Sequence, residues 1–157
     1  MEGEKVKLST KGRYGLRALI DLAVHCSEET VSIQSIARRQ NISDSYLEQL
    51  MRMMRKANLV VSVRGASGGY RLGRPADEIS VGDILRALEG SLEAVTCTAN
   101  QEENGCEGAD FCVTRYVWQK INDSITDAVD NIMLSQLVEE SRRIQEKGGP
   151  AGTVCNN

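Results

Sequence analysis

The feature that does most to limit how this chain can fold is a pair of short helical patterns followed directly by two short β-branched runs. A compact helix is predicted over residues 34–40, and Asn41 suits the left-handed residue that often ends a helix. A second helix is predicted over residues 43–57. Its apolar side chains recur at the spacing of one buried face: Leu47, Leu50, Met51 and Met54. Two helices joined by a tight turn are typical of a helix-turn-helix motif.

The two β-branched runs, residues 59–63 and 70–72, are separated by the glycine-rich segment 65–69. This pattern predicts a β-hairpin with a flexible tip, and a hairpin directly after a helix-turn-helix is the wing of a winged helix. The glycines do not form a phosphate-binding loop, because no Lys-Ser/Thr pair follows them and no helix begins there. With Arg64 beside Gly65, the backbone can instead approach a DNA groove and the guanidinium can enter it.

Helices are also predicted before and after this motif. Ser9 can cap a helix over residues 11–27. Ser80 and Asp83 resemble a capping box for a helix over residues 80–90.

A long helix is predicted over residues 113–133. Its apolar residues are spaced alternately by three and four positions, as in a short heptad seam: Trp118, Ile121, Ile125, Ala128 and Ile132. Too few elements remain in the chain to bury this stripe, so we expect the helix to pack against its copy in a homodimer. The alternative is a helix that lies across the winged domain of the same chain.

Charge and composition narrow the function. Residues 31–75 carry 8 basic and 2 acidic side chains, whereas residues 81–157 carry 6 basic and 13 acidic ones. A basic module is typical of a surface that binds DNA, although a solvated charged face is the simpler alternative. No apolar run reaches the roughly 18 residues that span a bilayer and no signal peptide is seen, so a cytoplasmic protein without membrane contact is expected. No enzyme is expected, because the chain has 1 histidine, no catalytic triad or carboxylate-pair spacing and no nucleotide loop.

Three of the five cysteines, Cys97, Cys106 and Cys112, fall in one polar, glycine-containing stretch with little apolar surface to bury. Their spacing differs from the close pairs of zinc sites, and three thiolates on a flexible loop suit an iron–sulfur cluster. Free buried thiols are the alternative, which fits Cys26 on its apolar helix but fits the trio poorly. A zinc-stabilised domain and a metal-free thiol sensor also stay open.

The predicted fold class is mainly α with a small β wing: a winged helix-turn-helix domain plus a long dimerisation helix. Only 2 prolines and 4% aromatic residues disfavour an all-β sandwich. The predicted regions are a DNA-binding domain over residues 7–90, a cysteine-bearing cluster-binding loop over residues 91–112, a dimerisation helix region over residues 113–146 and a disordered tail over residues 147–157.

Several sequence blocks resemble the Rrf2 family of bacterial winged-helix regulators, and most closely its iron–sulfur cluster regulator branch. The blocks are residues 7–14, 42–50, 59–65 and 68–70, together with the three cysteines. The resemblance implies a homodimeric repressor of iron–sulfur cluster biogenesis genes. It further implies one cluster per subunit, a [2Fe-2S] cluster held by Cys97, Cys106 and Cys112, with cluster-assembly proteins as donors. Related branches sense nitric oxide, or regulate cysteine metabolism without metal, and both remain alternatives.

The chain departs from this resemblance at the fourth cluster ligand. Relatives of the cluster-regulator branch have fewer residues between their first two cysteines, and they carry a histidine ligand where this chain has Arg115, whose guanidinium cannot bind a metal. In the nitric-oxide branch the ligand is a carboxylate on the partner's first helix, and Arg13 stands at that position. The fourth ligand therefore stays open. The candidates are Glu102, Glu103, Glu107, Asp110, His25, a small thiol or water.

The helix that begins near Ser43 is predicted to lie in the DNA major groove. The predicted DNA-binding residues are Ser43, Ser45, Tyr46, Glu48, Gln49, Arg52, Arg64 and Gly65. Among them Ser45, Tyr46 and Arg52 would bind backbone phosphates, Gln49 would pair with adenine, and Glu48 would accept a hydrogen bond from cytosine.

Two of these residues carry further expectations. Glu48 would discriminate between operator sequences, but Ser45 and Glu48 also have the spacing of a capping box, which is the alternative interpretation. Arg64, at the predicted wing, would enter the minor groove.

Overall fold

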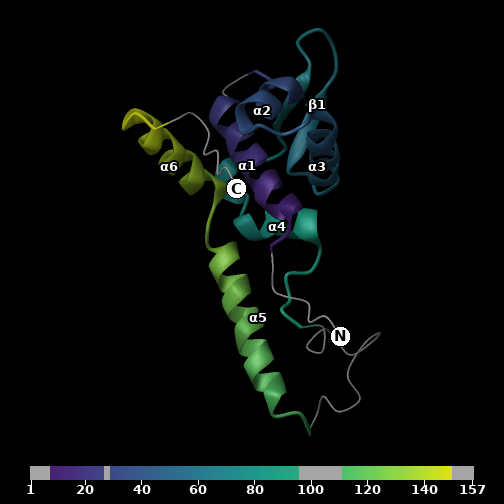
Figure 1. Cartoon of the computed structure of the whole chain (residues 1–157), viewed down its shortest axis with the longest axis vertical. Helices are drawn as coiled ribbons and strands as arrows, with labels where there is room; N and C mark the ends of the chain where they lie inside the picture. The colour runs from purple at the N-terminus through teal and green to yellow at the C-terminus, as the bar shows by residue number, and fades with distance from the viewer. Residues whose placement is uncertain (1–7, 27–28, 96–110, 150–157) are drawn as a thin grey trace.

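The computed structural model describes residues 8–26, 29–95 and 111–149 (Figure 1). In chain order it contains helices α1 (Thr10–His25), α2 (Ile33–Gln40) and α3 (Asp44–Lys56), strands β1 (Val60–Val63) and β2 (Gly69–Leu72), the short 3-10 helix η1 (Ala76–Glu78), and helices α4 (Val81–Glu89), α5 (Thr114–Asp130) and α6 (Leu134–Glu146). The predicted fold class, mainly α with a small β wing, is confirmed. Within these ranges no helix is both long enough and apolar enough to cross a membrane.

Side-chain caps define the helix-turn-helix. The Ser32 hydroxyl accepts a hydrogen bond from the Ser35 backbone N–H at 3.2 Å, where α2 begins. The Ser43 hydroxyl accepts one from the Tyr46 backbone N–H at 3.3 Å, where α3 begins. Each cap satisfies a backbone donor that has no partner within the helix. Between the two helices Asn41 has a φ of 52°, the left-handed conformation that ends α2, so the predicted turn is confirmed.

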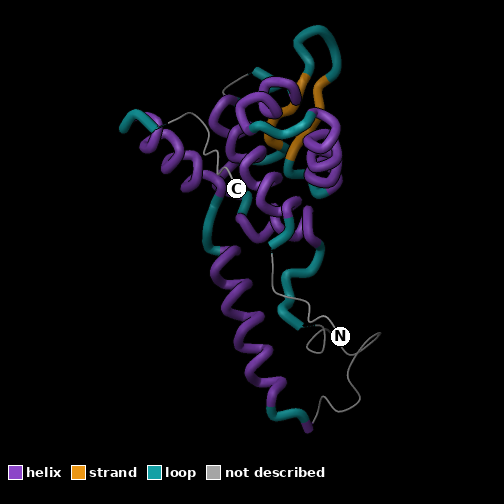
Figure 2. The backbone as a smooth tube through the Cα atoms, in the orientation of Figure 1, coloured by secondary structure: helices purple, strands orange, loops and turns teal. Residues whose placement is uncertain are grey.

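The wing is an antiparallel pair of strands joined to the start of α2 (Figure 2). Its register runs from Val60 opposite Leu72 to Val63 opposite Gly69. On the other side of β2, Val31 and Tyr70 exchange two backbone hydrogen bonds of 2.8 Å. Because Val31 lies just before α2, this bridge makes the hairpin part of the same rigid unit as the helix-turn-helix.

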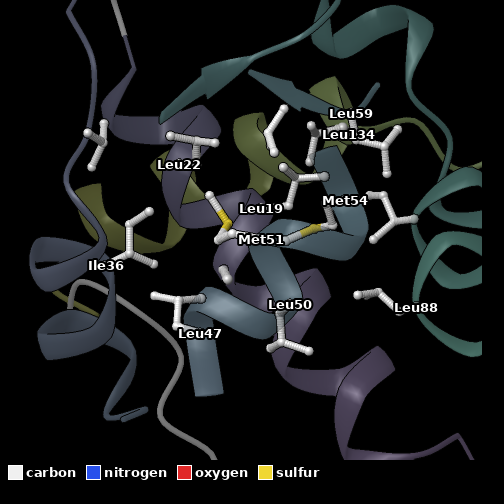
Figure 3. Packing of buried hydrophobic residues seen from close by; sticks show 14 of the residues in the cluster. Leu19, Leu22, Ile36, Leu47, Leu50, Met51, Met54, Leu59, Leu88 and Leu134 are labelled. Carbon is white, nitrogen blue, oxygen red and sulfur yellow. The ribbon is translucent and has the colours of Figure 1, made fainter. Parts of the chain in front are cut away.

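The predicted apolar face of α3 lies in the centre of the core (Figure 3). The four stripe residues are all buried: Leu47, Leu50, Met51 and Met54. They pack with Leu19 and Leu22 of α1 and Ile36 of α2. The core thus holds the two helices of the motif against α1 and leaves the opposite side of α3 in solvent.

The chain past α5 differs from the prediction. The helix expected over residues 113–133 ends at Asp130, and a separate helix, α6, returns to the winged domain and packs against α1. Residues 131–133, called the elbow here, pair with the start of α4: the Val81 N–H donates to the Ile132 carbonyl at 2.8 Å, and the Leu134 N–H donates to the Ile79 carbonyl at 2.8 Å. Leu134 is then fully buried in the core.

Helix α5 leads away from the winged domain and does not lie across it (Figure 1). None of its residues is buried. Several large apolar side chains at its start and along its length are exposed: Phe111, Val113, Tyr116, Val117 and Ile121. At its C-terminal end, Arg86 of α4 donates hydrogen bonds of 2.7 and 2.9 Å to the two carboxylate oxygens of Asp130. The pair lowers the pKa of Asp130 below its ordinary value, chiefly through the hydrogen bond from Arg86.

Candidate nucleic-acid interface and cysteine segment

The outward side of α3 carries the residues predicted to contact DNA. Ser45, Glu48, Gln49 and Arg52 are all exposed, on the side of the helix opposite its buried stripe. Ser43 is exposed as well, and its hydroxyl caps the helix. A helix held by one apolar face, with a polar face in solvent, has the geometry needed to enter a major groove.

Tyr46 differs from its neighbours because it is only partly exposed. Its ring meets the ring of Tyr14, on α1, edge to face, with 6.1 Å between the centroids and 89° between the planes. Burial raises the pKa of the Tyr46 hydroxyl above its ordinary value, and the nearby Tyr14 and Glu89 side chains add to the rise. The hydroxyl therefore stays protonated and can donate a hydrogen bond to an anion.

The alternative role of Glu48, as part of a capping box with Ser45, is wrong. The residue that caps α3 is Ser43, so Ser45 already lies inside the first turn. Local spacing could not decide between the two serines, because both precede the same apolar run. Glu48 is left on the exposed side of the helix.

Arg64 and Gly65 lie at the tip of the wing, where both are exposed. Gly65 has a φ of 118°, a conformation that side chains other than glycine rarely adopt, and its carbonyl accepts a hydrogen bond from the Gly68 N–H at 3.0 Å. Arg55 of α3 donates to the Ser62 hydroxyl of β1 at 3.3 Å. The wing and the outward side of α3 are thereby held in one arrangement.

The structure also brings in residues that the sequence analysis did not assign to this surface. Arg17 of α1 lies over the Tyr14 ring, which in turn meets the Tyr46 ring. The Glu89 carboxylate accepts hydrogen bonds from the Ser9 hydroxyl at 2.6 Å and from the Ser9 and Gly12 backbone N–H groups at 3.0 Å, at the start of α1. These contacts join residues distant in sequence, and no local motif signals them.

Of the three cysteines predicted to bind metal, Cys97 and Cys106 lie outside the described residues, as do the candidate ligands Glu102, Glu103, Glu107 and Asp110. Cys112 is exposed directly before α5, with its sulfur 3.0 Å from the Thr114 hydroxyl oxygen. That hydroxyl, together with the Arg115 backbone N–H, lowers the pKa of the Cys112 thiol below its ordinary value. The site thus favours a thiolate, the form of cysteine that binds metals.

The remaining fourth-ligand candidate, His25, lies at the end of α1, where its Nδ1 is 2.8 Å from the Asp21 carbonyl. Its Nδ1 also lies 3.5 Å from the Asp21 carboxylate, which accepts hydrogen bonds from Arg39 and Gln40 of α2. Among the described residues, no group of three or more histidine, cysteine, aspartate or glutamate side chains could hold a metal ion.

Comparisons with known proteins agree with this geometry. The family Rrf2, described as "Iron-dependent Transcriptional regulator", matches residues 8–140. The HTH-type transcriptional regulator IscR of Pectobacterium carotovorum is 46% identical over 133 residues, which are 85% of this chain and 79% of that protein. The solved structure of T. potens IscR has a TM-score of 0.70 and 44% identity, and the match covers 88% of this chain and 90% of that chain.

A second solved structure, CymR, the global cysteine regulator of B. subtilis, has a TM-score of 0.69 and 42% identity, with 85% of this chain and 97% of that chain covered. The family match, over residues 8–140, spans the winged helix-turn-helix and α5 together. The chain therefore belongs to the Rrf2 family, as an IscR-like DNA-binding transcriptional regulator.

Proposed function

We propose that this regulator senses an iron–sulfur cluster and that cluster occupancy modulates how its dimer binds operator DNA. The output would be repression of iron–sulfur cluster biogenesis genes. The observation that carries the proposal is the place of Cys112: an exposed cysteine with a lowered thiol pKa, directly before a helix whose apolar side chains are exposed.

DNA recognition is assigned to two exposed surfaces. Ser43, Ser45, Tyr46 and Arg52 bind phosphates at and beyond the first turn of α3, where the positive end of the helix favours anions. Gln49 and Glu48 contact base edges in the major groove. Arg64, next to Gly65, enters the minor groove.

Dimerisation is assigned to α5. Val117 and Ile121 are exposed on this helix, and a soluble chain gains by covering such side chains with a second copy. A pair of α5 helices sets the distance between the two recognition helices, as two-half-site operators require.

The cluster would be bound by Cys97, Cys106 and Cys112, as one [2Fe-2S] centre per subunit, with cluster-assembly proteins as donors. The Thr114 hydroxyl and the first backbone N–H groups of α5 favour the thiolate of Cys112. When bound, the cluster supplies a redox-active centre that soft sulfur ligands hold. Because Cys112 adjoins α5, binding of a cluster at Cys112 would change how α5 is held, and hence the spacing of the recognition helices.

A metal-free regulator of cysteine metabolism is the second candidate, favoured by the similarity to CymR. The absorption spectrum of protein purified without oxygen separates the two. The proposal expects a brown protein with visible charge-transfer bands, iron and acid-labile sulfide. A colourless protein that lacks both iron and sulfide after reconstitution would contradict it, and bound zinc would indicate a structural metal domain. Bleaching of the bands by nitric oxide, with loss of DNA binding, would instead support the nitric-oxide alternative.

Coupling to DNA is tested by comparing the cluster-loaded protein with its Cys106→Ala variant, with Cys26→Ala as the matched control. Cys26 lies at the end of α1, where its thiol donates to the Glu29 carbonyl, so this variant should keep both cluster and binding. The Cys106→Ala variant should lose the cluster and change its affinity for at least one operator. Equal affinity on every operator would end the coupling hypothesis.

A further inference from the structure

We infer that Tyr14 and Arg17, both on α1, are positioning residues that hold Tyr46 of the recognition helix in the orientation needed to bind a DNA phosphate. The inference rests on the proposed phosphate contact of Tyr46. Its starting point is the set of contacts that these three side chains make with one another. The Tyr46 ring meets the Tyr14 ring at 89°, with the centroids 6.1 Å apart, and the guanidinium carbon of Arg17 lies 5.2 Å from the Tyr14 centroid. Both aromatic pairs at this angle and cations over an aromatic face are attractive arrangements.

Arg17 is itself fixed, because the last residue of α2 accepts two hydrogen bonds from it. The Arg17 Nε donates to the Gln40 side-chain oxygen at 3.2 Å, and its Nη2 donates to the Gln40 backbone carbonyl at 2.9 Å. Gln40 is only 4% exposed. The planar guanidinium is therefore held at two points, and lysine could not reproduce this geometry.

Gln40 in turn contacts a buried charge. Asp21 of α1 is 5% exposed, and it accepts a hydrogen bond from the Gln40 side-chain nitrogen at 2.8 Å. Arg39 donates to the same carboxylate, from Nε at 3.0 Å and from Nη2 at 2.6 Å. A buried carboxylate with this set of donors is stable in one geometry only, because loss of a donor leaves an uncompensated charge. A chain of contacts thus runs from a rigid cluster between α1 and α2, through Arg17 and Tyr14, to the first turn of α3.

This arrangement has a consequence for binding. A side chain that is already held in its bound orientation loses less conformational freedom when it meets a ligand. Without the Tyr14 ring, Tyr46 would sample other rotamers, and its phosphate contact would weaken. Tyr14 acts through Tyr46 and needs no contact of its own with DNA.

A double-mutant cycle tests this on the full-length protein, with a fluorescently labelled duplex of mixed sequence at low salt as the probe. A phosphate contact is independent of base sequence, so no operator is required. Tyr46→Phe should weaken binding by about 3- to 10-fold, since it removes the hydroxyl and keeps the ring. Tyr14→Ala should weaken binding by a similar factor alone, but should have almost no effect in the Tyr46→Phe background. Tyr14→Phe keeps the ring and should bind as the unmodified protein does.

The results that would contradict the inference differ from those that would contradict the proposed phosphate contact. Equal effects of Tyr14→Ala in both backgrounds would overturn the inference alone, as would a loss on Tyr14→Phe equal to that of Tyr14→Ala. Unchanged binding by Tyr46→Phe would show that the proposed phosphate contact is wrong, and the inference would fail with it. If Tyr14→Ala does not fold by circular dichroism, Arg17→Lys takes its place, because it keeps the charge and removes the two-point hold on Gln40. Arg17→Lys should then weaken binding in the unmodified protein but have almost no effect in the Tyr46→Phe background, and equal effects in both backgrounds would refute the inference.

Discussion

The winged domain and helix α5 are built from the same kind of amphipathic pattern, yet the apolar side chains of α3 are buried and those of α5 are not. The apolar stripe of α3 is entirely buried, with Met51 and Met54 fully enclosed. Helix α5 has no buried residue, and Tyr116 at its start is 71% exposed. An amphipathic pattern therefore predicts which face of a helix is apolar, but it does not predict which other surface covers that face. For α3 the partners lie on α1, α2 and α4, whereas the described part of the chain buries no residue of α5.

The largest expected effect comes from charging the exposed stripe of α5. Ile121→Asp places a carboxylate where a second copy of α5 would pack, so the dimer should dissociate. Binding to a two-half-site operator should then fall about 100- to 10,000-fold, because the effective concentration of the second half is lost. Light scattering and binding titrations check this.

Thr126→Asp, exposed on the same helix but outside the apolar stripe, is the matched control and should remain dimeric. If Ile121→Asp also remains dimeric and binds normally, α5 is not the interface, and the contrast between the two regions loses its functional meaning.

A core truncation in the winged domain should have the next largest effect. Leu19→Ala, at a fully buried site of α1, is expected to lower the free energy of unfolding by about 2–5 kcal/mol, because apolar burial is lost and a cavity is left behind. The measurement is denaturant unfolding in the Ile121→Asp background, so that dimerisation does not contribute. In that background Tyr116→Ala should change stability by less than about 0.5 kcal/mol. Similar losses from both would contradict the contrast in burial.

Gly82→Ala tests the contact between α4 and the C-terminal end of α5, where the two regions meet. A Cβ at Gly82 would meet the Asp130 carboxylate, which is held by Arg86, so the base of α5 must shift. A cost of about 1–3 kcal/mol is expected, as for other forced insertions into close packing. Thermal unfolding measures it, with Gly90→Ala as a comparison at a position with open space but a φ of 82°. If Gly82→Ala is neutral, the contact between α4 and α5 is looser than the geometry indicates.

Glu48→Ala addresses sequence preference. Glu48 is exposed on the outward side of α3, and removal of its acceptor should relax discrimination at the contacted base by about 1–3 kcal/mol. Affinities across a set of operator variants provide the measurement. A uniform loss on every sequence would contradict a role in base recognition.

The smallest effect is expected at the wing. Arg64→Ala should reduce the slope of log affinity against log salt by about 1, because removing this cation from the minor groove lowers the number of counterions released on binding. Arg143→Ala on α6, an exposed arginine paired with Glu140, is the control and should leave the slope unchanged. Equal slopes for all three proteins would remove Arg64 from the DNA surface.

Much of the winged domain could be predicted from sequence because its signals are local. The caps at Ser43 and Ser80, the left-handed turn at Asn41 and the buried face of α3 each depend on residues within a few positions of one another. The glycine-rich tip between two β-branched runs likewise predicts the wing, whereas its register is seen only in the structure.

The errors fall where distant segments meet. The end of α5 at Asp130 depends on backbone pairing of the elbow with the start of α4, a contact that no pattern within residues 113–133 reveals. The alternative cap at Ser45 stayed open because two serines precede the same apolar run, and the structure has the cap at Ser43, where the helix is predicted to begin. Glu89 reaches the start of α1 from the far end of α4, and only the packing of these helices brings the carboxylate there.

The helices and strands of the winged domain and the apolar faces of these helices follow from the sequence, since periodicity, caps and turn residues act over a few positions. Three features become visible only in the folded chain: α6 packs against α1, the buried Asp21 carboxylate joins α1 to α2, and the Tyr14 ring contacts the Tyr46 ring. The physical reason is that these outcomes depend on side chains far apart along the chain. Their burial and hydrogen bonding are favourable only after the core has brought the helices together.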